Sequence, residues 1–90
     1  MAWTLVYTAS AAREIRQIDP AVRRRLNAAL QKLREEPDRG KPLQFSLRGL
    51  RSWRTGDYRI VYRVVETRIE ILIVASGHRR DVYSKLHAAL

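Results

Sequence analysis

The sequence predicts a single α+β domain, because helical periodicity dominates the residues before 36 and strand-like alternation dominates those after 43. Its 90 residues suffice for one modest core but not for two, and a hydrophobic content of 46% argues against disorder. We therefore expect one domain over residues 1–90, with two helices near the N-terminus, an antiparallel sheet of about four strands and a short C-terminal helix.

The first elements follow from local signals. Large residues alternate from Trp3 to Tyr7, which predicts an opening strand. Thr8 or Ser10 can cap a short helix that carries Ile15 and Ile18. That helix should end before the Asp-Pro pair at 19–20, because proline disfavours helical geometry in the residue before it.

A second helix is the strongest local prediction. Asp19 at the cap and Pro20 at the first helical position form a good start signal. One helical stripe then collects the apolar residues Val22, Leu26, Ala29, Leu30 and Leu33. The breaker-rich segment 37–42 joins this helix to the sheet.

The second half predicts three strands, over residues 50–55, 58–65 and 68–76, with short turns at 56–57 and 66–67. Connections this short imply an antiparallel meander. The last strand should lie inside the sheet, because both of its faces are partly apolar, and one face should carry Ile69, Ile71, Ile73 and Ala75. Residues 81–90 have helical spacing, which accounts for the expected C-terminal helix.

The segment 53–63 carries the most functional information. Alternation places Tyr58, Ile60, Tyr62 and Val64 on a packing face, and it places Arg59, Val61 and Arg63 on a face with positive charge. We interpret Trp53 as sheet packing and Asp57 as a turn former. Guanidinium groups on such a face match the oxygens of phosphate groups.

The net charge of the chain also favours the binding of phosphate groups. The chain has 18 Lys and Arg against 9 Asp and Glu, which gives a net charge of +9. This favours encounter with polyanions such as nucleic acid, although an acidic protein or an anionic membrane surface would also be attracted.

Several classes of protein are disfavoured. Cysteine is absent, and His78 and His87 form no recognisable ligand cluster with carboxylates, so we expect neither a metal site nor a cofactor. The longest aliphatic run, residues 71–75, is too short to span a bilayer, and no signal-peptide pattern precedes Arg13. A cytoplasmic protein without a membrane partner is the expectation.

Three motifs in fixed order carry a family resemblance. They are Leu47-Arg48-Gly49, the segment WRTGDYRIVY at 53–62, and the block GHRRDVY at 77–83. Together they resemble the RelE/ParE superfamily of bacterial toxin–antitoxin toxins over essentially the whole chain. The second and third motifs look closer to the RelE branch.

The resemblance implies a sheet cradled by the two helices and, for RelE-like members, a ribosome-dependent endoribonuclease that cuts messenger RNA. It also implies a cognate antitoxin, and a toxin–antitoxin complex that is a candidate binder of operator DNA. By this resemblance Arg59 and Arg79 match functional arginines, Tyr83 matches a functional tyrosine, and Arg54 occupies a commonly basic position. Residues 50–52, Leu-Arg-Ser, stand where RelE-like members carry lysines.

RNA cleavage without a metal needs attack of a 2′-hydroxyl on the adjacent phosphate, stabilisation of the phosphorane charge and protonation of the leaving oxygen. Arginines suit charge stabilisation, so we expect Arg54, Arg59 and Arg79 to grip the phosphate. Proton transfer falls to His78 or Tyr83, with the choice left open. The expected RNA-binding residues are Arg48, Arg51, Arg63, His78 and Arg80.

Two alternatives remain at this level. A ParE-like protein would inhibit a DNA topoisomerase by binding, without cleaving RNA, and the missing lysines favour it modestly. An inert protein of the same fold would only bind nucleic acid or antitoxin.

Overall fold

The computed structural model of the chain describes residues 2–78 and residue 82. It contains two α-helices, α1 (Ala9–Arg16) and α2 (Pro20–Glu35). It also contains five strands, β1 (Thr4–Tyr7), β2 (Lys41–Pro42), β3 (Arg51–Thr55), β4 (Tyr58–Val65) and β5 (Glu70–His78). Single 3-10 turns at Phe45–Leu47 and Glu66–Arg68 complete the order. The expected C-terminal helix at 81–90 falls outside the described residues, apart from Val82.

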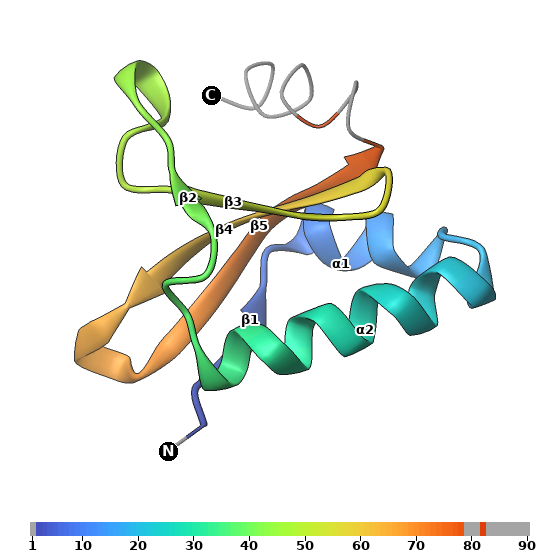
Figure 1. Cartoon of the computed structure of the whole chain (residues 1–90), viewed down its shortest axis with the longest axis horizontal. Helices are drawn as coiled ribbons and strands as arrows, with labels where there is room; N and C mark the ends of the chain where they lie inside the picture. Colours follow the sequence, from blue (N-terminus) through green and yellow to red (C-terminus); the bar gives the residue numbers. More distant parts are fainter. Residues whose placement is uncertain (1, 79–81, 83–90) are drawn as a thin grey trace.

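The five strands form one mixed sheet in the order β1-β5-β4-β3-β2. β1 runs parallel to β5, and the other neighbours are antiparallel. Both helices lie against one face of this sheet (Figure 1). The meander and the interior position of β5 are confirmed, while the sheet has one more strand than expected because the two-residue β2 carries no alternation that sequence could reveal.

Side-chain caps fix where the helices begin. The Thr8 hydroxyl accepts a hydrogen bond from the amide of Ala11 at 3.1 Å. Asp19 does the same for Ala21 at 3.1 Å, with Pro20 at the first helical position. Each cap satisfies a backbone donor that the helix itself leaves open, and contributes about 1 kcal/mol.

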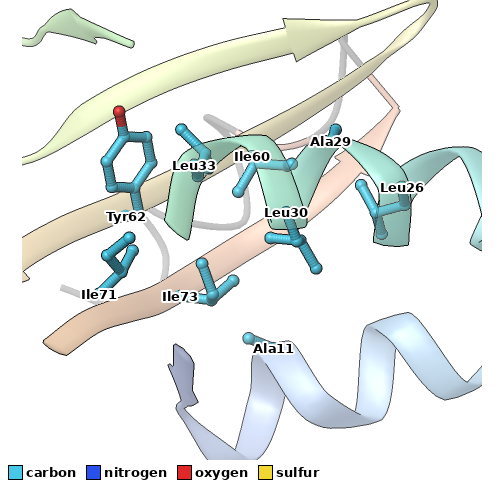
Figure 2. Packing of buried hydrophobic residues seen from close by; sticks show 9 residues of the cluster. All are labelled: Ala11, Leu26, Ala29, Leu30, Leu33, Ile60, Tyr62, Ile71 and Ile73. Atoms are coloured by element: carbon cyan, nitrogen blue, oxygen red, sulfur yellow. The ribbon is translucent and has the colours of Figure 1, made fainter. Parts of the chain in front are cut away.

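The main core lies between the helices and the sheet (Figure 2). Its buried members come from both helices and from the two central strands; they are Ala11, Leu26, Ala29, Leu30, Leu33, Ile60, Tyr62, Ile71 and Ile73. Four residues of the predicted stripe of α2 therefore face β4 and β5, whereas Val22 is not part of this core. Burial of each large apolar side chain contributes about 1.5–3 kcal/mol.

A β-bulge in β5 changes which side chains face the helices. Tyr62 pairs with Ile73, but the preceding residue Val61 pairs with Ala75, so Val74 is the extra residue. Two residues then oppose one, and the alternation of β5 restarts after Val74. The prediction that Ala75 shares a face with Ile71 and Ile73 is therefore wrong, because Ala75 lies on the opposite face with Val61.

That opposite face carries a second, smaller core made of Leu47, Leu50, Val61, Ala75 and Val82. Val61 is fully buried there. The face of β4 that alternation predicted to be cationic is thus apolar in its middle and basic on either side.

None of the helices in the described part of the chain is long and apolar enough to cross a membrane.

Ile73→Ala should lower the free energy of unfolding by about 2–5 kcal/mol, because it opens a cavity between the sheet and the helices. Urea unfolding followed by circular dichroism measures the change. Ile69→Ala is the matched control, since Ile69 is 43% exposed and lies in a turn. Equal losses in the two variants would contradict the assignment of the core.

Candidate functional site

Two arginines meet on adjacent strands. Arg54 of β3 and Arg59 of β4 are direct cross-strand partners near the Gly56 turn. Side chains of such partners lie on one face about 4.5–5.5 Å apart at Cβ, and like charges in that position destabilise a sheet. A bound anion that contacted both guanidinium groups would offset this repulsion.

Arg59 is the better fixed of the two. Its Nη1 donates a hydrogen bond to Oγ of Ser52 at 3.2 Å, and Ser52 is buried on the same face of β3. Arg59 is half-buried, whereas Arg54 is exposed. The guanidinium of Arg59 is therefore held in place before any ligand arrives, which reduces the entropy lost on binding.

These residues line a hollow of about 470 Å³, which we call the cationic hollow. Its lining consists of Arg39, Lys41, Ser52, Trp53, Arg54 and Arg59. Among the residues that the structure describes, this lining holds four cations and no carboxylate. The charge and the volume suit a phosphate group with part of its nucleotide.

Arg39 and Lys41 are the lining residues that the sequence did not single out. The guanidinium carbon of Arg39 lies 5.7 Å from the ring centroid of Trp53, and its Nε lies 3.3 Å from a carboxylate oxygen of Glu36. Arg39 precedes β2 and Lys41 is its first residue, so both lie in the breaker-rich segment 37–42. Its two basic residues were a signal, but only the fold shows that they reach the same place as Arg59.

A buried tyrosine holds this segment in position. The Tyr62 hydroxyl donates a hydrogen bond to the carbonyl of Pro37 at 2.7 Å and accepts one from the amide of Gly40 at 2.9 Å. A Cβ at residue 40 would lie 2.6 Å from the same hydroxyl, so only glycine fits. We call this arrangement the Tyr62 tie.

Arg51 strengthens the tie and does not belong to the cationic hollow. Its Nη1 donates to the carbonyl of Gly40 at 2.6 Å. It pairs with Tyr62 across β3 and β4, so it lies on the helix-facing side of the sheet, opposite to Arg54 and Arg59. The grouping of Arg51 with the RNA-binding arginines is therefore corrected, because alternation along β3 separates them.

Burial raises the pKa of the Tyr62 phenol, and the nearby Asp38 adds to this effect, while the amide of Gly40 and the charge of Arg51 act in the opposite direction. Tyr62 is thus a neutral hydrogen-bonding group and no candidate for acid–base work at neutral pH.

Arg48 and Arg63 lie apart from the hollow. Both are exposed, and Arg63 stands four residues along β4 from Arg59, a separation of about 13 Å. One Arg63 nitrogen would lie 3.9 Å from a Cβ at Gly49, which places it beside the turn that carries Arg48. Arg48 and Arg63 form a second basic area. The small core around Val61 separates this area from the cationic hollow.

The remaining predicted residues belong to the end of the chain. Gly77 of β5 is the cross-strand partner of Arg59, and His78 is the partner of Tyr58, so the last described residues of β5 run beside Arg59. Arg79, Arg80 and Tyr83 lie outside the described residues. Within the described part, no group of three or more His, Cys, Asp or Glu residues could hold a metal ion.

Fold and site together define a small basic α+β protein with a cationic hollow along β2, β3 and β4 that is large enough for a phosphate group and part of its nucleotide. The family model of the ParE toxin of type II toxin–antitoxin systems matches residues 5–83. The chain belongs to the RelE/ParE superfamily of type II toxins.

Individual relatives support this assignment. Toxin RelG of Mycobacterium tuberculosis is 33% identical over 87 residues, which cover 94% of this chain and all of the relative. The crystal structure of the toxin–antitoxin complex RelBE2 from the same organism matches with a TM-score of 0.81 at 32% identity, over 88% of this chain and all of the matched chain. The isolated RelE toxin of E. coli shares the fold, with a TM-score of 0.77 at 21% identity over 98% and 96% of the two chains.

Tyr62→Phe should lower the free energy of unfolding by about 1–3 kcal/mol, because the buried amide of Gly40 loses its acceptor. Urea unfolding at neutral pH measures the loss. Tyr7→Phe serves as control, since Tyr7 is 39% exposed and so more accessible than the fully buried Tyr62, and its effect should stay within about 0.5 kcal/mol. A neutral result for Tyr62→Phe would show that the tie contributes nothing.

The raised pKa of Tyr62 also predicts alkaline destabilisation. The folded protein holds the phenolic proton more tightly than the unfolded chain, so this contribution is complete below the ordinary value of 10.0 and is lost as pH rises through the higher folded value. Urea midpoints should therefore fall above about pH 10. The fall should be smaller in Tyr62→Phe, with a residual part from Tyr7, whose pKa is raised by burial as well. Parallel pH profiles for the two proteins would contradict this account.

Proposed function

We propose that this toxin is a metal-independent endoribonuclease that cuts messenger RNA on the ribosome, with the cationic hollow as the seat of the scissile phosphate. One observation carries the proposal: Arg54 and Arg59 are direct partners, Arg59 is anchored by Ser52, and no acid among the described residues lines the hollow. The assignment to the superfamily and the likeness to RelG are consistent with it.

The chemistry follows from what arginine does well. Attack of the 2′-hydroxyl on the adjacent phosphorus places extra negative charge on the phosphate oxygens, and a fixed guanidinium fork stabilises that charge. Arginine keeps its proton near neutral pH, so Arg54 and Arg59 act as electrostatic clamps and transfer no proton.

Residues at the end of the chain complete the mechanism. Arg79 adds a third clamp, and Tyr83 or His78 moves the proton, as the family resemblance implies. The run of β5 beside Arg59 supports this, because Gly77 and His78 lie next to the hollow's strand. Arg48, Arg63 and Arg80 bind the RNA on either side of the cut.

The ribosome supplies the geometry that the hollow lacks. In-line attack requires the 2′-oxygen, the phosphorus and the leaving oxygen to be aligned, and such alignment supplies a large part of a rate enhancement. An open cationic surface attracts RNA but does not bend it. We therefore expect translating ribosomes to present the messenger in the reactive shape.

A cognate antitoxin is the expected protein partner. The solved relative from M. tuberculosis is a toxin–antitoxin complex, and its toxin fold matches most of this chain. In our proposal the antitoxin blocks the basic surface of this toxin, and the complex binds operator DNA.

The second candidate function is inhibition of a DNA topoisomerase by binding. It is favoured by the family model that matches residues 5–83, which is that of the ParE toxin. Brief induction followed by mapping of RNA ends separates the two. Cuts at fixed positions within translated codons support the nuclease, whereas intact messenger with a DNA damage response supports the topoisomerase inhibitor.

Arg59→Ala should reduce the rate of cleavage on programmed ribosomes by about 100-fold or more, because the transition-state charge loses a fixed donor. Arg79→Ala should have a similar effect. Arg68→Ala is the matched control, because this substitution removes the same charge at an exposed residue. Arg68 lies in the turn that follows β4, at the opposite end of that strand from Arg59. Wild-type rates in folded Arg59→Ala, or equal cleavage of naked and translated messenger by the wild type, would refute the mechanism.

A further inference from the structure

We propose that Lys41 contacts the same phosphate as Arg59, so that the short strand β2 contributes a catalytic residue to the site. This inference deepens the proposed ribonuclease function and rests on it.

Strand register brings Lys41 into the site. Lys41 is the direct cross-strand partner of Ser52, and direct partners share a face. Ser52 in turn accepts the hydrogen bond from Arg59 at 3.2 Å. The small side chain of Ser52 thus lies between two cations, one on β2 and one on β4. Both border the cationic hollow, and an anion above Ser52 would lie between them.

Lys41 is suited to an incoming anion by its surroundings. It is exposed, and it forms no ion pair with any residue in the described part of the chain. Arg39, the other cation of this segment, is already engaged with Glu36 and Trp53. An ammonium on a flexible stem adds charge to the bound phosphate without the fixed fork that Arg59 provides.

The backbone of Lys41 is held in place. The residue before it, Gly40, has its amide bound to the Tyr62 hydroxyl and its carbonyl bound to Arg51. Both partners lie on the helix-facing side of the sheet. The Tyr62 tie therefore limits where the Lys41 side chain starts, and this lowers the entropic cost of placing its ammonium against a ligand.

Two substitutions of Lys41 separate the effect of its charge from the effect of its side-chain stem. Lys41→Met keeps most of the side-chain stem and removes the charge, whereas Lys41→Arg keeps the charge. On programmed ribosomes, kcat/KM should fall by about 10–100-fold in Lys41→Met and stay within about 10-fold of wild type in Lys41→Arg. Arg68→Ala again controls for net charge, and urea unfolding verifies that each variant folds.

A binding measurement gives a second readout that needs no cleavage. With a single-stranded RNA whose 2′-hydroxyls are replaced by hydrogen, the logarithm of the affinity falls with the logarithm of the salt concentration. Loss of one phosphate contact should reduce that slope by about 0.7 in Lys41→Met, and leave it unchanged in Lys41→Arg.

The outcomes separate this inference from the proposed function. Wild-type kcat/KM in Lys41→Met, or an equal loss in Lys41→Arg and Lys41→Met, overturns the role of Lys41 while the nuclease stands. Absence of cleavage by the wild type, with the slope still reduced in Lys41→Met, overturns the nuclease and keeps Lys41 as a phosphate contact.

Discussion

The hydroxyl of Tyr62 joins the core of this protein to its site. The ring is fully buried among the side chains of α2 and β5, so the fold determines where the oxygen lies. That oxygen binds the carbonyl of Pro37 and the amide of Gly40, the two ends of the turn that leads into β2. The position of the cations on this segment therefore depends on the packing of a residue on the other face of the sheet.

The sheet itself has two different faces. One face is covered by the helices, and the other carries a small apolar core with basic areas on both sides. The bulge at Val74 makes this arrangement possible, because it turns Ala75 toward Val61 while Ile73 still packs against the helices. Arg59 and Arg63 thus belong to separate basic areas, although they lie on one strand and one face. An RNA chain that contacts both would cross the small core.

Local physics made much of this fold predictable. The caps at Thr8 and Asp19 and the stripe of α2 depend on neighbours a few residues away, so the sequence indicates them directly. The bulge, the strand β2 and the Tyr62 tie depend on contacts between distant segments, and no periodicity marks them. The family resemblance grouped Arg54 with Arg59, and the pairing of β3 with β4 brings them together. Arg51 was grouped with the RNA-binding arginines, although its spacing of two from Trp53 already placed it on the packing face. Lys41 was visible in the sequence only as one of two basic residues in the breaker-rich segment.

Because β2 has only two residues, it leaves part of the edge of β3 uncovered. It pairs only with residues 51 and 52, so residues 53–55 of β3 present their outer backbone groups with no neighbouring strand in the described part of the chain. Open edges of this kind invite association with a second copy. Here an approaching copy would bring its own Arg54 and Lys41 toward the same cations, and electrostatic repulsion would oppose the contact. The charges that we assign to phosphate binding would thereby also oppose self-association along this edge.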